Sequence, residues 1–282
     1  MSSSLSPELV IQTSQLDTLL NQTNILLVFI GSEEAFRETH IPGSQHIKPS
    51  ELVCGVAPAA GKIADADDLA FLFSRIGLNE NSIVIAYDDE GGGWAGRFIW
   101  TLDIIGHSNY HYLDGGLIAW LGEKRETENG FSKNNLSDGN EQPSVEININ
   151  STLIVSAENI IESLNNDDDF IVWDARSPQE HNGEKVLAAR GGHIPGAANI
   201  NWLDLMDRNN FLRLKPLAII EAMLDDKKLT ADKNIVTHCQ SHHRSGLTYL
   251  VGKIIGLNIK AYDGSWSEWG NLENTPIDNP AN

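Results

Sequence analysis

The sequence has few cysteines, few basic residues and no long apolar run. Only two of its 282 residues are cysteine, Cys54 and Cys239, which are too few and too far apart for a disulfide framework or a metal cluster. Its 20 Lys and Arg are outnumbered by 39 Asp and Glu, which gives a net charge of -19 and disfavours nucleic acid and acidic membranes as partners. We therefore expect no metal and no nucleic-acid partner, and an anionic substrate would need a local positive pocket.

The sequence also lacks the features of a targeting signal and of a membrane-spanning segment. The opening MSSSLSPELV lacks both a basic start and an apolar core, and no apolar stretch reaches membrane-spanning length. The sequence therefore predicts a cytoplasmic protein that does not bind membranes. Its length favours two domains of ordinary size.

The chain contains an internal duplication. The motif HIPG occurs at His40 and again at His193, and IVIAYDD from Ile83 is paralleled by IVTHCQS from Ile235. Two further pairs follow in the same order, namely IIG with IIG and LDGGLIAW with YDGSWSEW. Four ordered pairs indicate a duplicated domain.

The polar segment ETENGFSKNNLSDGNEQPS is rich in Gly, Asn and Ser and ends the first copy. We place the N-terminal domain at residues 5–130, a linker at 131–145 and the C-terminal domain at 146–280.

Short apolar runs alternate with amphipathic stretches in both copies. Strands apolar on both faces and separated by helices predict an α/β fold in which each domain has a mainly parallel sheet covered by helices on both faces. Ligands bind such sheets beyond the carboxyl ends of the strands, where Cys239 stands. The expected strands are ILLVFI, SIVIAY, YHYLDG, FIVWDA, NIVTHC and IKAYDG, and the expected helices include DADDLAFLFSRIG and PLAIIEAMLDD.

The stretch IVTHCQSHHRSG has the features of an anion-binding active-site loop. If a helix begins near Ser245, the turn from Cys239 to Arg244 lies at its N-terminus, where amides and the helix dipole attract an anion. His242, His243 and Arg244 add donors or positive charge, so we expect Cys239 to be a nucleophilic thiolate rather than an inert buried residue.

The length of this loop separates two kinds of chemistry. A cysteine phosphatase has five residues between its cysteine and arginine, whereas four separate Cys239 from Arg244. The smaller ring would crowd a phosphoryl group but could hold one additional sulfur atom.

The six-residue loop, the doubled HIPG and the closing DG…W element together resemble the tandem-domain rhodanese family of sulfurtransferases. The resemblance implies two rhodanese-like domains, with an active C-terminal copy and an inactive N-terminal copy. The first-copy counterpart of the loop, AYDDEGGGWAGR, agrees with this because Asp88, Asp89 and Glu90 stand where a nucleophile and an anion site would be needed.

The family resemblance also assigns roles to residues around Cys239. It implies that Cys239 becomes a persulfide and that Arg176 and Arg244 hold the anionic donor, while Asp174 has a structural role. Arg176 could instead be a salt-bridge partner of Asp174 or Glu180. The remaining loop residues expected at the substrate are Gln240, Ser241, His242 and His243, although either histidine could simply be exposed.

The predicted reaction is transfer of sulfur from thiosulfate to cyanide or a thiol by a monomer without a cofactor. The cationic loop sequence CQSHHR favours thiosulfate as the donor, while 3-mercaptopyruvate remains an alternative donor. A cysteine phosphatase and a non-catalytic module that carries the persulfide are the rival functions.

Overall fold

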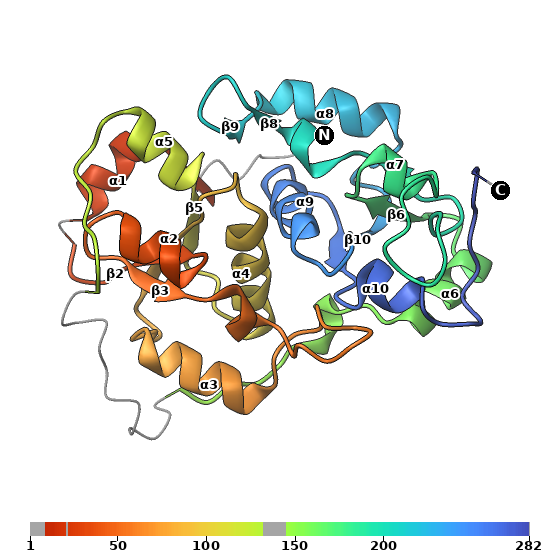
Figure 1. Cartoon of the computed structure of the whole chain (residues 1–282), viewed down its shortest axis with the longest axis horizontal. Helices are drawn as coiled ribbons and strands as arrows, with labels where there is room; N and C mark the ends of the chain where they lie inside the picture. Colours follow the sequence, from red (N-terminus) through yellow and green to blue (C-terminus); the bar gives the residue numbers. More distant parts are fainter. Residues whose placement is uncertain (1–8, 21, 132–144, 282) are drawn as a thin grey trace.

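Alternating strands and helices build two similar α/β halves that pack side by side (Figure 1). The computed structural model describes residues 9–20, 22–131 and 145–281. Most of the predicted linker, 131–145, lies outside these residues.

The first half contains a five-stranded parallel sheet in the order β1-β5-β4-β2-β3. Its carboxyl edge therefore collects the loops that follow β2, β4 and β5. The elements are β1 (Val10–Ile11), α1 (Thr13–Leu19), β2 (Ile25–Ile30), α2 (Glu33–Glu38), β3 (Gln45–Ile47), the 3-10 helix η2 (Pro49–Leu52), α3 (Ala66–Arg75), β4 (Ile83–Tyr87), α4 (Gly93–Ile104), β5 (Tyr110–Leu113) and α5 (Gly116–Gly122).

The second half repeats this order around a four-stranded parallel sheet, β11-β10-β6-β7. An antiparallel pair, β8 with β9, is added between β7 and α8. The elements are η4 (Ser151–Leu153), α6 (Ala157–Asn166), β6 (Phe170–Asp174), α7 (Pro178–His181), β7 (Ala198–Asn199), η5 (Trp202–Leu205), β8 (Met206–Asp207), β9 (Arg213–Leu214), α8 (Leu217–Asp226), β10 (Asn234–His238), α9 (Arg244–Ile254), β11 (Ile259–Ala261) and α10 (Ser265–Trp269).

Successive side chains of each central strand enter different cores. In β2, Val28 and Ile30 join the core with α3 and α4, whereas Leu27 and Phe29 face the core formed with α1, α2 and α5. The same alternation divides β6 between α8 and α9 on one side and α6 and α10 on the other. Burial on both faces explains why these strands are continuously apolar, and it confirms the predicted parallel sheets covered on both sides.

Two glycines allow the halves to meet through helices α4 and α9. A Cβ atom on Gly96 would lie 2.3 Å from the carbonyl oxygen of Gly246, and one on Gly246 would lie 2.4 Å from the Gly93 oxygen. The helices therefore cross with their backbones in direct contact near their N-termini. As a result, the loops that precede the two helices lie next to each other.

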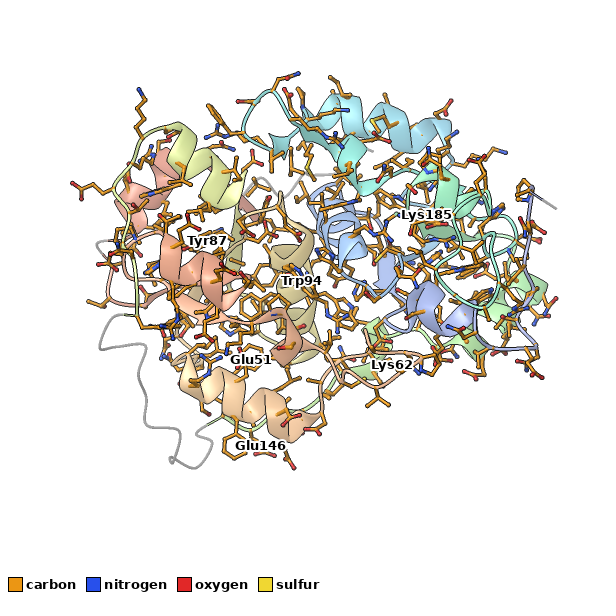
Figure 2. The ribbon with its side chains drawn as sticks, viewed as in Figure 1. Glu51, Lys62, Tyr87, Trp94, Glu146 and Lys185 are labelled. Carbon is orange, nitrogen blue, oxygen red and sulfur yellow. The ribbon has the colours of Figure 1, made fainter. Side chains whose placement is uncertain are left out.

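The aspartates of the two repeated DG motifs each accept a hydrogen bond from a backbone amide of the opposite half. Asp114 accepts a hydrogen bond from the Leu214 amide at 2.8 Å, and Asp263 accepts one from the Ile63 amide at 2.9 Å. Lys62 adds an ion pair with Glu268 of α10, at the junction seen in Figure 2. These reciprocal contacts hold part of the first half against the loop that contains Cys239.

Within the described residues, every helix is too short or too polar to cross a membrane.

Candidate active site

Cys239 is the first residue after the central strand β10, and α9 begins at Arg244. Cys239 is buried, with only 1% of its surface exposed to solvent. Its backbone is anchored on α10, because the Ser265 hydroxyl accepts from the Cys239 amide at 3.4 Å and the Trp266 amide donates to the Cys239 carbonyl at 3.0 Å. The predicted strand-to-helix turn is therefore present and firmly attached to its surroundings.

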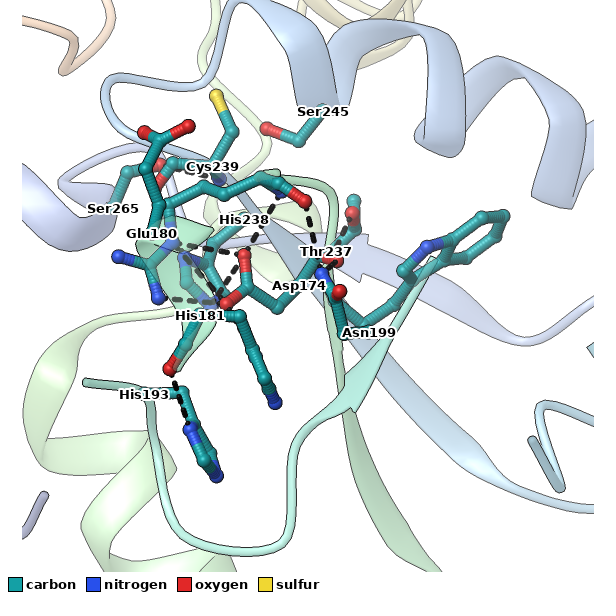
Figure 3. A network of polar contacts seen from close by, with 12 residues as sticks. Asp174, Glu180, His181, His193, Asn199, Thr237, His238, Cys239, Ser245 and Ser265 are labelled. Atoms are coloured by element: carbon teal, nitrogen blue, oxygen red, sulfur yellow. Dashed lines mark hydrogen bonds and ion pairs between the residues drawn. The ribbon is translucent and has the colours of Figure 1, made fainter. Parts of the chain in front are cut away.

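The sulfur of Cys239 points toward the start of α9 (Figure 3). Burial opposes ionisation of the thiol, but the Arg244 charge, the Ser245 hydroxyl and amide, and the His243 charge together hold the pKa of Cys239 below its ordinary value. A helix N-terminus favours the thiolate in the same direction. The environment thus supports a nucleophilic sulfur.

Arg244 is fixed beside Cys239 by a buried carboxylate. Its two terminal nitrogens donate to the two oxygens of Glu180, each at 2.8 Å. Glu180 lies in the short helix α7, where Ser177 caps the helix and also donates to its carboxylate. Burial opposes ionisation of Glu180, yet Arg244 and Ser177 lower its pKa to about 2. The pair orients a permanent positive charge at the sixth position of the loop.

Arg176 forms a buried ion pair with Asp174. Its guanidinium donates to both oxygens of Asp174, at 2.7–3.2 Å, and to the Gly192 carbonyl at 2.8 Å. It also lies over the Trp266 ring, 4.2 Å from the centroid. Asp174 is fully buried and requires this partner, so the predicted alternative of a salt bridge is present, and the contact of Arg176 with the donor stays a prediction.

Asp174 is the centre of a polar network behind the loop (Figure 3). Besides Arg176, it contacts His181 Nδ1 at 2.9 Å and lies 3.8 Å from His238 Nε2. Burial lowers the pKa of His238 to about 4, so its ring is neutral, and its Nδ1 contacts the Cys239 carbonyl at 3.0 Å. The network supports the end of β10 and does not reach the sulfur.

His242 is a buried neutral residue rather than an exposed cation. Its backbone adopts a positive φ of 55°, and its ring packs edge-on against Trp100 of the first half, 4.5 Å between centroids. Burial holds its pKa well below the ordinary value, and the nearby Arg97 acts in the same direction. Its Nδ1 lies 2.7 Å from the Ser245 hydroxyl. His242 therefore orients Ser245, and its predicted contact with the substrate stays a prediction.

His243 remains partly exposed and carries the positive charge. It forms an ion pair with Glu90 and stacks on Trp94, 4.3 Å between centroids. Burial opposes protonation, but Glu90 raises the pKa of His243 above its ordinary value. His243 is thus paired with Glu90 of the first half, and its predicted contact with the substrate stays a prediction.

The other two loop residues border neighbouring segments. Gln240 donates from its side chain to the Leu187 carbonyl at 3.1 Å. The carbonyl of Ser241 lies so close to Gly61 that a Cβ atom there would come within 2.2 Å of it. The contacts of both residues with the substrate stay predictions.

The first-copy loop already contains its own anion. Asp88, the first residue after β4, is fully buried and accepts hydrogen bonds from the amides of Glu90, Gly91 and Gly92 and from that of Ala95, at 2.9–3.2 Å. Burial and the nearby Glu90 raise its pKa to about 6. The Asp88 carboxylate thus takes up the amides that an external anion would need, and the inactivity of the first copy stays a prediction.

The sequence did not reveal the roles of Glu180, Ser245 and Glu90. The spacing of Ser177 and Glu180 is typical of a helix N-terminus, but it does not show that the carboxylate contacts Arg244. The contact of Glu90 depends on the packing of one copy against the other. Within the described residues, no group of three or more His, Cys, Asp or Glu could hold a metal ion.

Two segments, residues 12–123 and 156–272, match the rhodanese-like domain family. The chain is 44% identical over 274 residues to a thiosulfate sulfurtransferase of Azotobacter vinelandii, with 96% of this chain and 97% of that protein covered. It is 42% identical over 278 residues to a thiosulfate sulfurtransferase of Pseudomonas aeruginosa, with the same coverage. A sulfur carrier protein of Thermus thermophilus, TtuD, is 29% identical over 283 residues and covers 96% of each chain.

Solved structures share the fold at much lower identity. The crystal structure of YnjE has a TM-score of 0.85 and 20% identity, over 98% of this chain and 70% of that chain. An anaerobic ergothioneine biosynthesis enzyme from Chlorobium limicola has a TM-score of 0.84 and 16% identity, over 97% of this chain and 71% of that chain.

Proposed function

The chain belongs to the rhodanese family, as its doubled motifs predicted, and on this premise we propose that it is a thiosulfate sulfurtransferase that carries sulfur on Cys239. The observation that carries the proposal is the contrast between the two loops. In the first, four amides bind the Asp88 carboxylate, whereas in the second a thiol takes that position beside Arg244 and the Ser245 hydroxyl.

The proposed reaction has two steps. The Cys239 thiolate attacks the outer sulfur of thiosulfate, the sulfur–sulfur bond of the donor breaks, and sulfite leaves with the bonding electrons. The resulting persulfide is an anion, which the loop amides, the Ser245 hydroxyl and Arg244 would stabilise. A thiol or cyanide then attacks the outer sulfur, forming a new persulfide or thiocyanate and restoring the Cys239 thiolate. No cofactor is required by these steps.

The charges around the loop support thiosulfate over 3-mercaptopyruvate. Arg244 and the protonated His243 provide two positive groups for a dianion. Both thiosulfate sulfurtransferases named above cover nearly the whole chain at more than 40% identity. Arg176 is ion-paired with Asp174, as Arg244 is with Glu180, and the KM of an Arg176 variant tests its predicted contact with the donor.

The direct test is the intact mass of the protein after separate incubation with thiosulfate and with 3-mercaptopyruvate. We expect thiosulfate to add one sulfur atom that cyanide removes, and Cys239→Ser to prevent the gain. Faster loading by 3-mercaptopyruvate would replace the proposed donor, and no loading by either compound would refute the persulfide mechanism.

A sulfur-carrying role is the second candidate, favoured by the similarity to the carrier TtuD. Turnover distinguishes the two functions. Rapid loading of Cys239 with negligible release to cyanide or small thiols would identify a carrier, whereas repeated turnover would identify an enzyme. Release of phosphate from an aryl phosphate without a persulfide would instead support the phosphatase.

We also propose that the protein acts as a monomer in the cytoplasm. Both cysteines are free, and the reducing cytoplasm would preserve the Cys239 thiol.

A further inference from the structure

The crossing of α4 and α9 brings the loop of the inactive copy against the loop of the active one. Gly96 and Gly246 set this crossing, and both loops stand at the N-terminal ends of the crossing helices. Glu90 of the first loop thereby reaches His243 of the second. The contact links the two halves at the site itself.

The His243 ring is held on several sides by groups from both halves. Its Nε2 meets the Glu90 carboxylate, one face stacks on Trp94 with an interplanar angle of 17°, and Trp202 lies 5.7 Å away between centroids. Trp94 lies at the junction of the halves in Figure 2. The ring therefore has one well-defined position, with its charged partner supplied by the first copy.

We propose that Glu90 is a positioning residue for the reaction at Cys239: it fixes His243 as a cation in the active-site loop and so favours the Cys239 thiolate. The first copy then contributes to the electrostatics of the active site although it has no nucleophile. This inference rests on the proposed function, because it assigns a role in generating the sulfur nucleophile.

The charges that face His243 decide its protonation. Glu90 and Asp88 of the first loop and the Cys239 thiolate all favour the imidazolium, whereas Arg244 is an adjacent positive group and His242 is neutral. Without Glu90, burial would favour the neutral ring. His243 would then lose its charge near neutral pH, where the thiolate is needed.

An alternative role for Glu90 is an interdomain ion pair that only stabilises the fold. The sign of a thiol pKa change separates these roles. Removing a carboxylate near Cys239 lowers the thiol pKa by simple electrostatics, whereas losing the His243 charge raises it. A purely structural contact would therefore leave the thiol pKa unchanged or lower.

The experiment uses the full chain with Cys54→Ser, so that only Cys239 reacts with iodoacetamide. The rate of alkylation is measured against pH for this parent, for Glu90→Gln and for the matched control Asp89→Asn, which removes the neighbouring charge of the same loop. We expect Glu90→Gln to raise the apparent thiol pKa and to slow alkylation near neutral pH about three- to tenfold. Asp89→Asn should not raise the thiol pKa.

A double-mutant cycle with His243→Gln completes the test. If Glu90 acts through His243, the His243→Gln variant shows an increase in thiol pKa at least as large as that of Glu90→Gln, and adding Glu90→Gln to it causes no further increase. Circular dichroism establishes that each variant is folded. An unchanged or lower thiol pKa in folded Glu90→Gln, or fully additive increases in the double variant, would overturn the inference.

Alkylation of Cys239 does not require sulfur transfer, so the proposed function and the role of Glu90 can each be refuted without refuting the other. Absence of a persulfide in the parent protein would refute the proposed function. Normal persulfide formation without the predicted change in thiol pKa would refute only the role of Glu90.

Discussion

Asp88 and Cys239 occupy the same position in the two copies, directly after the central strand and before the helix that crosses its counterpart. The Asp88 carboxylate satisfies the amides of its own loop, whereas the Cys239 sulfur lies against Ser245 and Arg244. The same backbone arrangement thus holds an internal carboxylate in one half and the proposed nucleophile in the other.

The two cysteines are expected to differ completely in function. Cys239→Ser should abolish persulfide formation and thiocyanate production, because no other cysteine lies in an active-site loop. Cys54→Ser should retain nearly full activity, because Cys54 is exposed. Its thiol donates to the Ala59 carbonyl over 3.6 Å, a contact far from Cys239 in the sequence that a serine hydroxyl could replace. Intact mass and a thiocyanate assay measure both variants, and loss of activity in both would contradict the assignment.

Ser245 should control the acidity of the Cys239 thiol. Ser245→Ala removes the hydroxyl that favours the thiolate while leaving the amide in place. We expect the thiol pKa to rise by about one unit, which reduces alkylation near neutral pH about tenfold. The control is Ser267→Ala on α10, whose hydroxyl donates to Gly264. Equal alkylation profiles for the two variants would exclude this role.

Arg176 should contribute to stability rather than to donor binding. Arg176→Met leaves the buried Asp174 without its main partner, so we expect a loss of about 3 kcal/mol in the free energy of unfolding, measured with urea. The KM for thiosulfate of the folded protein should change little. Unchanged stability together with a large increase in KM would show that Arg176 binds the donor after all.

The Glu180–Arg244 pair should make stability dependent on pH in the acid range. The pKa of Glu180 is lowered from 4.5 to about 2 in the folded state, so its stabilising effect is complete above pH 4.5 and is lost as the pH falls toward 2. Glu180→Gln should remove about 2–3 kcal/mol of stability at neutral pH and less at pH 3. Urea unfolding at several pH values measures this difference.

If Glu180→Gln lowered the free energy of unfolding by the same amount at all pH values, the loss could not be due to ionisation of Glu180. Glu162→Gln, on the exposed side of α6, is the matched control and should leave the pH profile unchanged.

Much of the fold could be predicted because burial on both faces leaves a strong pattern. ILLVFI coincides with β2, and NIVTHC extends only one residue beyond β10. The repeated motifs also predicted two similar domains. The short strands β1, β3, β7, β8 and β9 were missed because two or three residues are too few to show a periodicity.

The site was predictable where it depends on local sequence. The position of Cys239 before a helix, the nearby Arg244 and the acidic first-copy loop follow from neighbouring residues. The partner of Arg176 was one of two alternatives, Asp174 or Glu180, whereas Trp100 and Glu90 meet His242 and His243 only through packing of the two halves. Sequence reasoning therefore proposed the nucleophile and the Asp174 partner of Arg176, but not the contacts that bury or pair the loop histidines.

The contact between Gly96 and Gly246 has an evolutionary consequence. A side chain at either position would collide with the backbone of the other copy, so mutations in the half without a nucleophile would displace the helix that follows Cys239. Selection for activity in one half therefore acts directly on the sequence of the other. After the duplication, the loop of the first copy could change its chemistry, but the helix surface around Gly96 could not drift freely.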